Sequence, residues 1–344
     1  MDRAAELAAW CRAFLPAWAA GEPDCTLIPL PGDAGFRRYF RLATRPSLIA
    51  VLAPPERAEL AAFVAKGAAL AAGGVRVPRL WAVDFRRGFL LLEDLGEEDL
   101  LTRLEREEPE PLYDLAEEAL QRIQALSPDA GVFPPYDRAA LVAELDLFPR
   151  WFLGRLLDLR LGEGEARLLG ETFALLVREA LSQPRVVVHR DFHSRNLLLD
   201  AEGRLGVVDY QDAVVGPVTY DLVSLWRDCY IRWPRELVWR RVERFFEGRL
   251  GRSAGSGVSG ELRRRWFDLM GLQRHLKVLG IFARLWLRDG KPRYLDDLPL
   301  VLRYVLEVSG EYPELGPFHR WLLERVVPAL PAQPWYRDWQ TAGE

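Results

Sequence analysis

Lysine is the scarcest charged residue in this chain of 344 residues. Lys66, Lys277 and Lys291 are the only lysines, although lysine and arginine together number 46. Arginine therefore supplies almost all of the positive charge, a bias that genomic base composition can produce. A mechanism that requires a lysine has only these three candidates.

Cysteine is equally rare. The three cysteines are Cys11, Cys25 and Cys229, with long spacings and no Cys-x-x-Cys pair. This pattern favours neither a disulfide framework nor a zinc site. No apolar run approaches the roughly 20 residues that a membrane helix needs, and residues 1–20 do not have the unbroken apolar core of a secretory leader. We therefore expect a reduced, cytoplasmic protein with no membrane partner.

An excess of positive charge is also absent, since the formal net charge is −4. A general nucleic-acid binder would carry a strongly basic domain or stripe, so we expect no nucleic-acid partner, and no feature requires an obligatory protein partner. Hydrophobic residues make up 49% and charged residues 28% of the chain, which is typical of a globular protein. At about 150 residues per domain, the length suggests two domains or one domain with two lobes.

Residues 1–95 predict a small, β-rich α+β lobe. Turn-forming residues separate its first three strands, which indicates an antiparallel meander. The expected elements are a helix over 3–20, strands over 25–30, 36–43 and 47–52, a helix over 54–72, and strands over 75–84 and 89–92.

Residues 96–344 predict a larger helical lobe. Helices are expected over 112–126, 138–157, 163–182 and from 219 onward, with a strand-rich stretch over 185–210. Glycine and serine in residues 251–257 indicate a flexible connection. A small lobe followed by a larger one leaves a cleft, and ligands usually bind in such clefts.

The strand-rich stretch carries the most informative polar residues. An apolar strand leads into a turn that contains Asp191 and Asn196. Leu197–Leu199 and Leu205–Val208 are natural hairpin partners around a glycine-containing turn. Folding that hairpin brings Asp209 back beside Asn196, so that three oxygen-bearing side chains converge.

Such a set suits phosphoryl transfer, in which the protein mainly positions the reactants and neutralises charge. Because Mg²⁺ prefers hard oxygen ligands, Asn196 and Asp209 are candidate metal ligands. Asp191 would accept or orient the proton of the acceptor hydroxyl. His189 is expected to order the loop by hydrogen bonding, and no helix or glutamate supports a zinc site with His193. The alternative is that each polar residue only caps a turn.

The motif His189-x-Asp191-x-x-x-x-Asn196, followed by Val208-Asp209-Tyr210-Gln211-Asp212, resembles the aminoglycoside phosphotransferase and choline kinase family, whose members are relatives of protein kinases. Gly216-Pro217-x-x-Tyr220-Asp221-Leu222 also resembles the segment that follows the metal aspartate in that family. The resemblance implies a two-lobed protein-kinase-like fold with ATP and Mg²⁺ as cofactors. A protein kinase itself is disfavoured, because the stretch from Asp209 to Asp221 is too short for an activation loop.

Three further segments, 32–41, 88–96 and 273–291, are similar to the branch of the family that phosphorylates the anomeric hydroxyl of N-acetylmuramate and N-acetylglucosamine. The resemblance implies an amino-sugar substrate and a role in peptidoglycan recycling. Gly35 stands where that branch usually has serine. The alternatives are a kinase for another hydroxyl substrate, such as an aminoglycoside, choline or homoserine, or a non-catalytic regulator that binds nucleotide.

The nucleotide site is expected in residues 1–95. Gly32 and Gly35 let backbone N–H groups approach phosphates, although a plain hairpin turn would also use them. The resemblance implies that the extended backbone from Glu93 to Leu95 hydrogen-bonds adenine, and an ordinary linker is the alternative.

The acceptor site is expected on a helix near residue 275. Gln273, Arg274 and Lys277 lie within about one turn, so they share one side of that helix. Arginine suits bidentate binding of a carboxylate, and lysine acts as a point charge. These residues would meet an anion such as the lactyl carboxylate of muramate or the sugar phosphate. A solvated surface is the alternative.

The third strand departs from the family pattern because it lacks a lysine. Kinases of this fold place a lysine there, paired with a glutamate on a helix, but residues 47–52 contain none, and Lys66 lies on the helix that normally supplies the glutamate. Either an arginine among Arg37, Arg38 and Arg41 supplies the phosphate charge, or Mg²⁺ and backbone amides suffice. We favour an arginine.

Overall fold

The computed structural model describes residues 3–15, 25–30, 37–53, 59–128, 131–250 and 258–344. The chain forms two compact units. The first contains Met1–Val132 and Arg195–Ala213, and the second contains Phe133–Ser194 and Val214–Glu344. The expected lobes of residues 1–95 and 96–344 stay a prediction.

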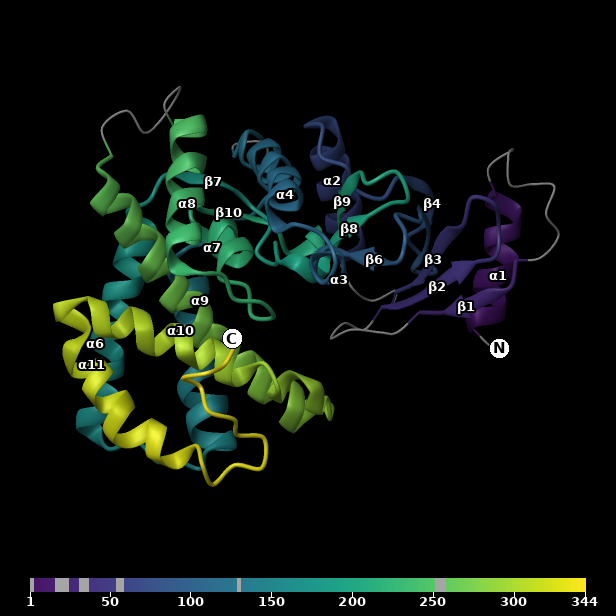
Figure 1. Ribbon diagram of the computed structural model, residues 1–344. Coiled ribbons are helices and arrows are strands. Elements are labelled where there is room, and N and C mark those ends of the chain that lie inside the picture. Colours follow the sequence, from purple (N-terminus) through teal and green to yellow (C-terminus); the bar gives the residue numbers. More distant parts are fainter. Residues whose placement is uncertain (1–2, 16–24, 31–36, 54–58, 129–130, 251–257) are drawn as a thin grey trace. The chain divides into compact units, whose positions relative to one another are not determined.

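The first unit is built on a five-stranded antiparallel sheet with the strand order β1-β2-β3-β5-β4 (Figure 1). Its strands are β1 Leu27–Pro29, β2 Arg38–Leu42, β3 Leu48–Leu52, β4 Leu80–Asp84 and β5 Phe89–Glu93. The register pairs Phe40 with Ala50 and Ala50 with Leu91, so these side chains share one face of the sheet. Helix α1, Arg3–Phe14, packs Leu7 and Trp10 against them in a buried core. The predicted meander is confirmed.

The predicted strand over 75–84 is too long. Strand β4 begins only at Leu80, and residues 75–79 form no strand. Pro78 accounts for the difference, because it has no backbone N–H to donate to a neighbouring strand. The carbonyl of Arg76 instead accepts the N–H of Val207 at 2.8 Å.

The rest of the first unit surrounds a second, three-stranded sheet. Leu197 pairs with Val207, so the predicted hairpin is confirmed, and a short strand that the sequence did not indicate, β6, adds to its edge. The elements are α2 Glu59–Ala72, β6 Glu98–Asp99, α3 Leu100–Leu104, α4 Pro109–Gln124, β8 Leu197–Leu199, β9 Leu205–Val207 and a 3-10 turn over Tyr210–Asp212.

The second unit is mainly helical and contains one antiparallel strand pair, in which Val188 lies opposite Val214. Its elements are α5 Arg138–Leu145, α6 Glu163–Leu181, β7 Arg185–Val188, β10 Val214–Pro217, α7 Tyr220–Trp226, α8 Arg235–Leu250, α9 Gly260–Asp289, α10 Leu298–Glu311 and α11 Gly316–Trp321. Within the described ranges, no helix combines the length and apolar character that crossing a membrane requires.

Helix α9 is the centre of the second unit. It contacts α6, α7 and α10 and is buried on all sides over much of its length (Figure 1). Ser259 caps its start by accepting the N–H of Leu262 at 3.2 Å, and Gly290 ends it with φ 67°. A helix that is buried all round carries its polar side chains inside the protein, where they need partners.

The predicted helix over 138–157 is interrupted. Helix α5 ends at Leu145, and wider π-helical turns cover Phe148–Leu156. Pro149 contributes to the break because it cannot donate the next helical hydrogen bond. Gly280 of α9 also packs onto the break, since a Cβ there would lie 2.5 Å from the carbonyl oxygen of Leu147.

Candidate active site

The loop that contains Asp191, the residue predicted to be catalytic, follows β7. Residues 189–194 are called the catalytic loop from here on, after that prediction. Asp221, which is fully buried on α7, accepts the backbone N–H groups of His189 at 2.6 Å and Arg190 at 2.9 Å. The N–H of Asp191 lies 3.3 Å from Nδ1 of His189. The expected role of His189 in ordering the loop by hydrogen bonding is thus seen.

The far end of the catalytic loop is held by a second buried carboxylate. Oδ2 of Asp228 accepts the N–H of Ser194 at 2.9 Å and its hydroxyl at 2.6 Å. Asp221 lies in the first turn of α7 and Asp228 lies two residues after its end, so one short stretch of chain fixes both ends of the loop. Sequence reasoning assigned no role to either residue.

The electrostatic surroundings of Asp191 keep it ionised. Burial alone would raise its pKa, but the positive charge of Lys277, with smaller effects of His193 and Arg190, outweighs burial and lowers the pKa below its usual value. An ionised carboxylate can accept a hydrogen bond from an acceptor hydroxyl. Its low pKa suits orientation of that hydroxyl better than early removal of the proton, which agrees with a loose transition state.

A buried polar cluster lies between α5, the catalytic loop and α9. Glu144 of α5 accepts hydrogen bonds from the Arg190 guanidinium and the Tyr136 hydroxyl, and its Oε1 lies 3.1 Å from Nζ of Lys277. Sequence reasoning missed Glu144. The available signal was its spacing, because Leu141, Glu144 and Leu145 follow the i, i+3, i+4 pattern of a buried face and all three are buried.

The three residues predicted for the acceptor site are all buried on α9, so a solvated surface is wrong for this segment. Gln273 donates to the Tyr136 hydroxyl at 3.1 Å, and Lys277 donates to the Tyr220 hydroxyl at 2.9 Å. Gln273 and Lys277 are therefore engaged within the protein.

Arg274 differs from its two neighbours. Its Nη1 lies 3.4 Å from Sγ of Cys229, and the charges of Asp228 and Asp221 interact with its guanidinium without a direct ion pair among the described residues. Burial raises the pKa of the Cys229 thiol to about 11, so the thiol stays neutral at pH 7. A buried cation beside a neutral thiol is costly unless an anion approaches it.

The predicted metal residues belong to the first unit, at the end of the β8–β9 hairpin. The N–H of Val208 donates to the carbonyl of Asn196 at 3.1 Å, which places Asp209 next to Asn196 along the hairpin. Asp209 is exposed in the left-handed region, with φ 64°, and its Oδ1 accepts from Gln211 at 2.6 Å. A carboxylate and an amide oxygen fit the donors that Mg²⁺ accepts beside nucleotide phosphates. Asp191 belongs to the second unit, and its convergence with this pair stays a prediction.

Lys66 supports the segment that follows Asp209. It is buried on α2 and donates from Nζ to the carbonyl of Gln211 at 2.6 Å. Phe63, one helical turn earlier, stacks on Tyr210 with a ring separation of 4.8 Å. The only lysine of the first unit is therefore engaged with the backbone beside the predicted metal ligand.

The three candidate arginines have different surroundings. Arg41 pairs with Asp94, with Nε 2.5 Å from Oδ2, and also with Glu97. Arg38 lies over the Phe40 ring at 5.1 Å, and Arg37 over the Phe63 ring at 5.2 Å. Gly32 and Gly35 lie outside the described residues.

Tyr39 links Arg37 electrostatically to the predicted metal ligand. Burial raises the pKa of Tyr39, Arg37 opposes that rise, and Asp209 adds to it. Both charges therefore act on one side chain. Arg37 thus lies in the same part of the first unit as Asp209.

The predicted adenine segment is anchored by its side chains. Glu93 accepts a hydrogen bond from Arg76 at 3.2 Å. Leu95 packs so closely on Gly206 that a Cβ added to Gly206 would lie 2.6 Å from Cδ1 of Leu95. Gly96 has φ 104°, and its N–H donates to Asp94 at 3.0 Å. Contact of this backbone with adenine stays a prediction.

The sequence pattern of the phosphotransferase enzyme family matches residues 26–265, which include the catalytic loop and the β8–β9 hairpin. The chain belongs to the phosphotransferase enzyme family. Its activity class, a phosphotransferase, agrees with the chemistry predicted from Asp191, Asn196 and Asp209.

Named relatives of this phosphotransferase match it over nearly the whole chain. The N-acetylmuramate/N-acetylglucosamine kinase of Pseudomonas aeruginosa is 44% identical over 318 residues, which is 90% of this chain and 93% of that protein. A kinase of the same name from Neisseria meningitidis is 40% identical over 333 residues, 95% of this chain and 97% of that one.

Solved structures show the fold. The choline kinase of Streptococcus pneumoniae matches with a TM-score of 0.61 at 14% identity, over 89% of this chain and 100% of that chain. A choline/ethanolamine kinase family protein from Mesorhizobium loti matches with a TM-score of 0.59 at 18% identity, over 91% and 99%. The predicted α+β, protein-kinase-like fold is confirmed.

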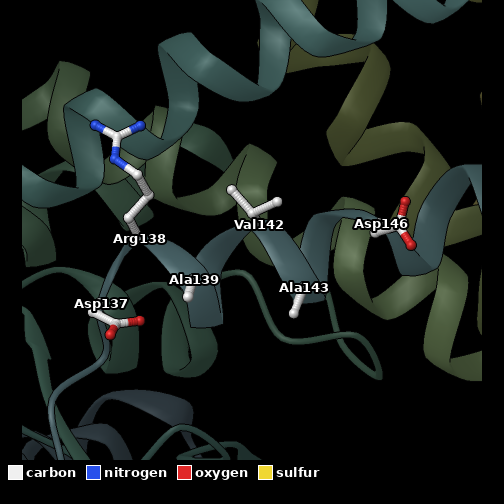
Figure 2. Close-up of a pocket in the computed structure, with 6 residues that line it drawn as sticks. All are labelled: Asp137, Arg138, Ala139, Val142, Ala143 and Asp146. Carbon is white, nitrogen blue, oxygen red and sulfur yellow. The ribbon is translucent and has the colours of Figure 1, made fainter.

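One pocket of about 680 Å³ lies along α5 of the phosphotransferase, and Figure 2 shows its lining side chains on that helix and at its two ends. The lining residues are Asp137, Arg138, Ala139, Val142, Ala143 and Asp146. None of the predicted site residues is among them, so this pocket enters no argument about the reaction.

Proposed function

We propose that this phosphotransferase uses ATP and Mg²⁺ to phosphorylate the anomeric hydroxyl of N-acetylmuramate and N-acetylglucosamine. The observation that carries the proposal is the 44% identity to a kinase of that name over 90% of this chain and 93% of the relative. The product would be a sugar 1-phosphate, the form that nucleotide activation consumes in recycling of cell-wall sugars. The three cysteines are buried and free, which agrees with a cytoplasmic location.

We assign the predicted site residues to three tasks. Asp191 orients the acceptor hydroxyl and receives its proton. Asn196 and Asp209 hold Mg²⁺, which neutralises the negative charge of the phosphate oxygens when it is bound. The backbone of Glu93–Leu95 takes adenine, and the backbone amides of Gly32 and Gly35 take the phosphates.

We propose that Arg37 is the positively charged side chain that contacts the nucleotide phosphates. Arg41 is already neutralised by Asp94 and Glu97, which leaves it little charge to offer a nucleotide. Arg37 has an aromatic contact with Phe63 and shares the electrostatic surroundings of Tyr39 with Asp209. A nucleotide phosphate bound near Asp209 would therefore feel the positive charge of Arg37.

We assign recognition of the acceptor's carboxylate to Arg274. Gln273 and Lys277, its neighbours on α9, have internal partners in Tyr136, Tyr220 and Glu144. The lactyl carboxylate of N-acetylmuramate matches the planar donor fork of arginine. N-acetylglucosamine has no such group, so the two sugars would differ in their dependence on this side chain.

The test is phosphate transfer from ATP to each sugar, with aminoglycosides, choline and homoserine as competing acceptors. We expect turnover with both amino sugars and phosphate on the anomeric oxygen, identified by phosphorus–proton coupling in the product. Turnover with one of the other acceptors and not with the amino sugars would contradict the substrate assignment.

Asp191→Asn is the matched test of the catalytic residue. We expect it to lower kcat by at least about 10³-fold, because proton acceptance and orientation of the hydroxyl are both lost. Asp158→Asn is the control, since Asp158 is exposed and has φ 51°, a conformation that asparagine tolerates well. Equal kcat values for the two variants would remove Asp191 from the mechanism.

A further inference from the structure

Glu144 is a buried carboxylate in which each oxygen has two polar partners. Its Oε1 accepts from the Arg190 guanidinium and lies 3.1 Å from Nζ of Lys277. Its Oε2 accepts from the Tyr136 hydroxyl and from Nε2 of Gln273, the latter at 3.4 Å. Because each oxygen already has two polar partners, the carboxylate is placed to hold other side chains.

The charge of Glu144 is stable in this surrounding. Burial would raise its pKa, but Lys277 and then Arg190 outweigh burial and lower it. The carboxylate is therefore ionised at neutral pH. It compensates two cations, the buried Lys277 on α9 and the half-buried Arg190 in the catalytic loop.

Arg190 is the residue through which Glu144 reaches the reacting group. Its φ is 78°, in the left-handed region that non-glycine residues rarely adopt. Two carboxylates hold it there, since Asp221 accepts its backbone N–H at 2.9 Å and Glu144 accepts from its guanidinium. A planar peptide bond joins Arg190 to Asp191. The backbone conformation of Arg190 therefore sets the direction in which the Asp191 side chain points.

We propose that Glu144 is a positioning residue that holds Arg190 in the left-handed conformation and thereby aims the Asp191 carboxylate at the acceptor hydroxyl. The inference rests on the proposed role of Asp191 in the reaction. Asp221 fixes the backbone of residue 190, and Glu144 fixes its side chain. A residue in this strained region persists only where its surroundings over-determine it, and these two attachments supply that restraint.

Glu144→Gln tests the proposal because it keeps the shape of the side chain and removes its charge. We expect kcat with N-acetylglucosamine to fall about 30-fold or more, while KM for ATP stays within about threefold. Glu144→Asp keeps the charge and should recover at least about tenfold of the loss. A purely structural role would lower the fraction of active protein without that recovery.

Glu117→Gln is the matched control, since Glu117 is also a buried helical glutamate but lies on α4 of the first unit. We expect it to leave kcat within about threefold of the wild type, whatever its effect on Tm. If Glu144→Gln lowers kcat no more than Glu117→Gln does, the proposal is overturned. If Glu144→Gln does not fold, Arg190→Lys is measured against the same control.

Hydrogen exchange decides the matter independently of the acceptor. In the Glu144→Gln variant we expect the backbone amides of residues 189–192 to exchange at least about tenfold faster, with no such change in Glu117→Gln. Unchanged exchange would overturn the proposal even if turnover fell. Failure of the proposed function would look different, because the wild type itself would then phosphorylate neither sugar, and the exchange result would still stand.

Discussion

Asp228 holds Ser194 twice, by accepting its backbone N–H at 2.9 Å and its hydroxyl at 2.6 Å through the same carboxylate oxygen. Asp221 holds the other end of the catalytic loop. Both ends of the loop are therefore anchored to the short stretch of chain from residue 221 to residue 228. The loop is thus fixed at both ends by hydrogen bonds to buried carboxyl groups.

Replacing Asp228 by alanine should weaken both stability and turnover. Loss of two hydrogen bonds to a buried carboxylate is expected to lower the free energy of unfolding by about 3 kcal/mol. Because Ser194 then moves more freely, we also expect kcat to fall at least about tenfold. Urea unfolding and steady-state kinetics check these effects. Asp146→Ala, at an exposed position that follows α5, serves as the control and should change neither.

Asp221 should make stability depend on pH. Burial raises its pKa from 3.8 to about 7. The folded state therefore binds a proton that the unfolded state releases, so the stability this group contributes is complete below pH 3.8 and is lost as the pH rises to 7. Between pH 5 and 7, the free energy of unfolding of the wild type should fall relative to Asp221→Asn by about 1.4 kcal/mol per pH unit.

Urea unfolding of both proteins from pH 5 to pH 8 measures that difference. It should level off above about pH 7, where Asp221 is ionised in both states. A difference that does not vary with pH would mean that Asp221 does not change its protonation on folding in this range. The lost N–H acceptor in Asp221→Asn adds an offset that is independent of pH and does not affect the slope.

Arg274→Gln should separate the two proposed substrates. A charge-assisted pair with the lactyl carboxylate is worth about 1.5–3 kcal/mol, or roughly 10–150-fold in kcat/KM for N-acetylmuramate. For N-acetylglucosamine we expect a change within about threefold. Equal losses for both sugars would indicate that Arg274 only stabilises the helix around Cys229, and Cys229→Ser should leave both values close to those of the wild type.

Arg37→Ala should weaken nucleotide binding. Without this cation we expect KM for ATP to rise roughly 10–100-fold, because a charge-assisted contact with a phosphate is lost. Arg38→Ala, on the next residue, should change KM for ATP less than about twofold. Arg41→Ala should lower Tm and leave KM for ATP nearly unchanged, since Arg41 is engaged with Asp94. An unchanged KM in Arg37→Ala would leave Mg²⁺ and backbone amides as the phosphate ligands.

Local patterns predicted much of the fold. Alternation and turn residues placed β2, β3 and the β8–β9 hairpin within two residues of their bounds. The errors occurred where a proline or a distant contact decided the backbone, as at Pro78 and in the interrupted helix after Leu145. Strand β10 was missed because its four residues form a strand only by pairing with β7, which lies far away in the sequence.

The polar residues of the site were predicted as single residues, but their partners were not. Motif and helical spacing indicated Asp191, Arg274 and Lys277. That α9 is buried on all sides follows only from the packing of other helices around it. Glu144 became visible only when the contact of α5 with α9 brought its carboxylate to Lys277.

The burial of two of the three lysines has a practical consequence. Lys66 and Lys277 are 5% and 6% exposed, and Lys291, just after α9, is the only lysine with appreciable solvent exposure. Reagents directed at ε-amines would therefore modify essentially one side chain of the folded protein. A dye, cross-linker or solid support attached in this way would have a defined position and would leave both buried lysines intact.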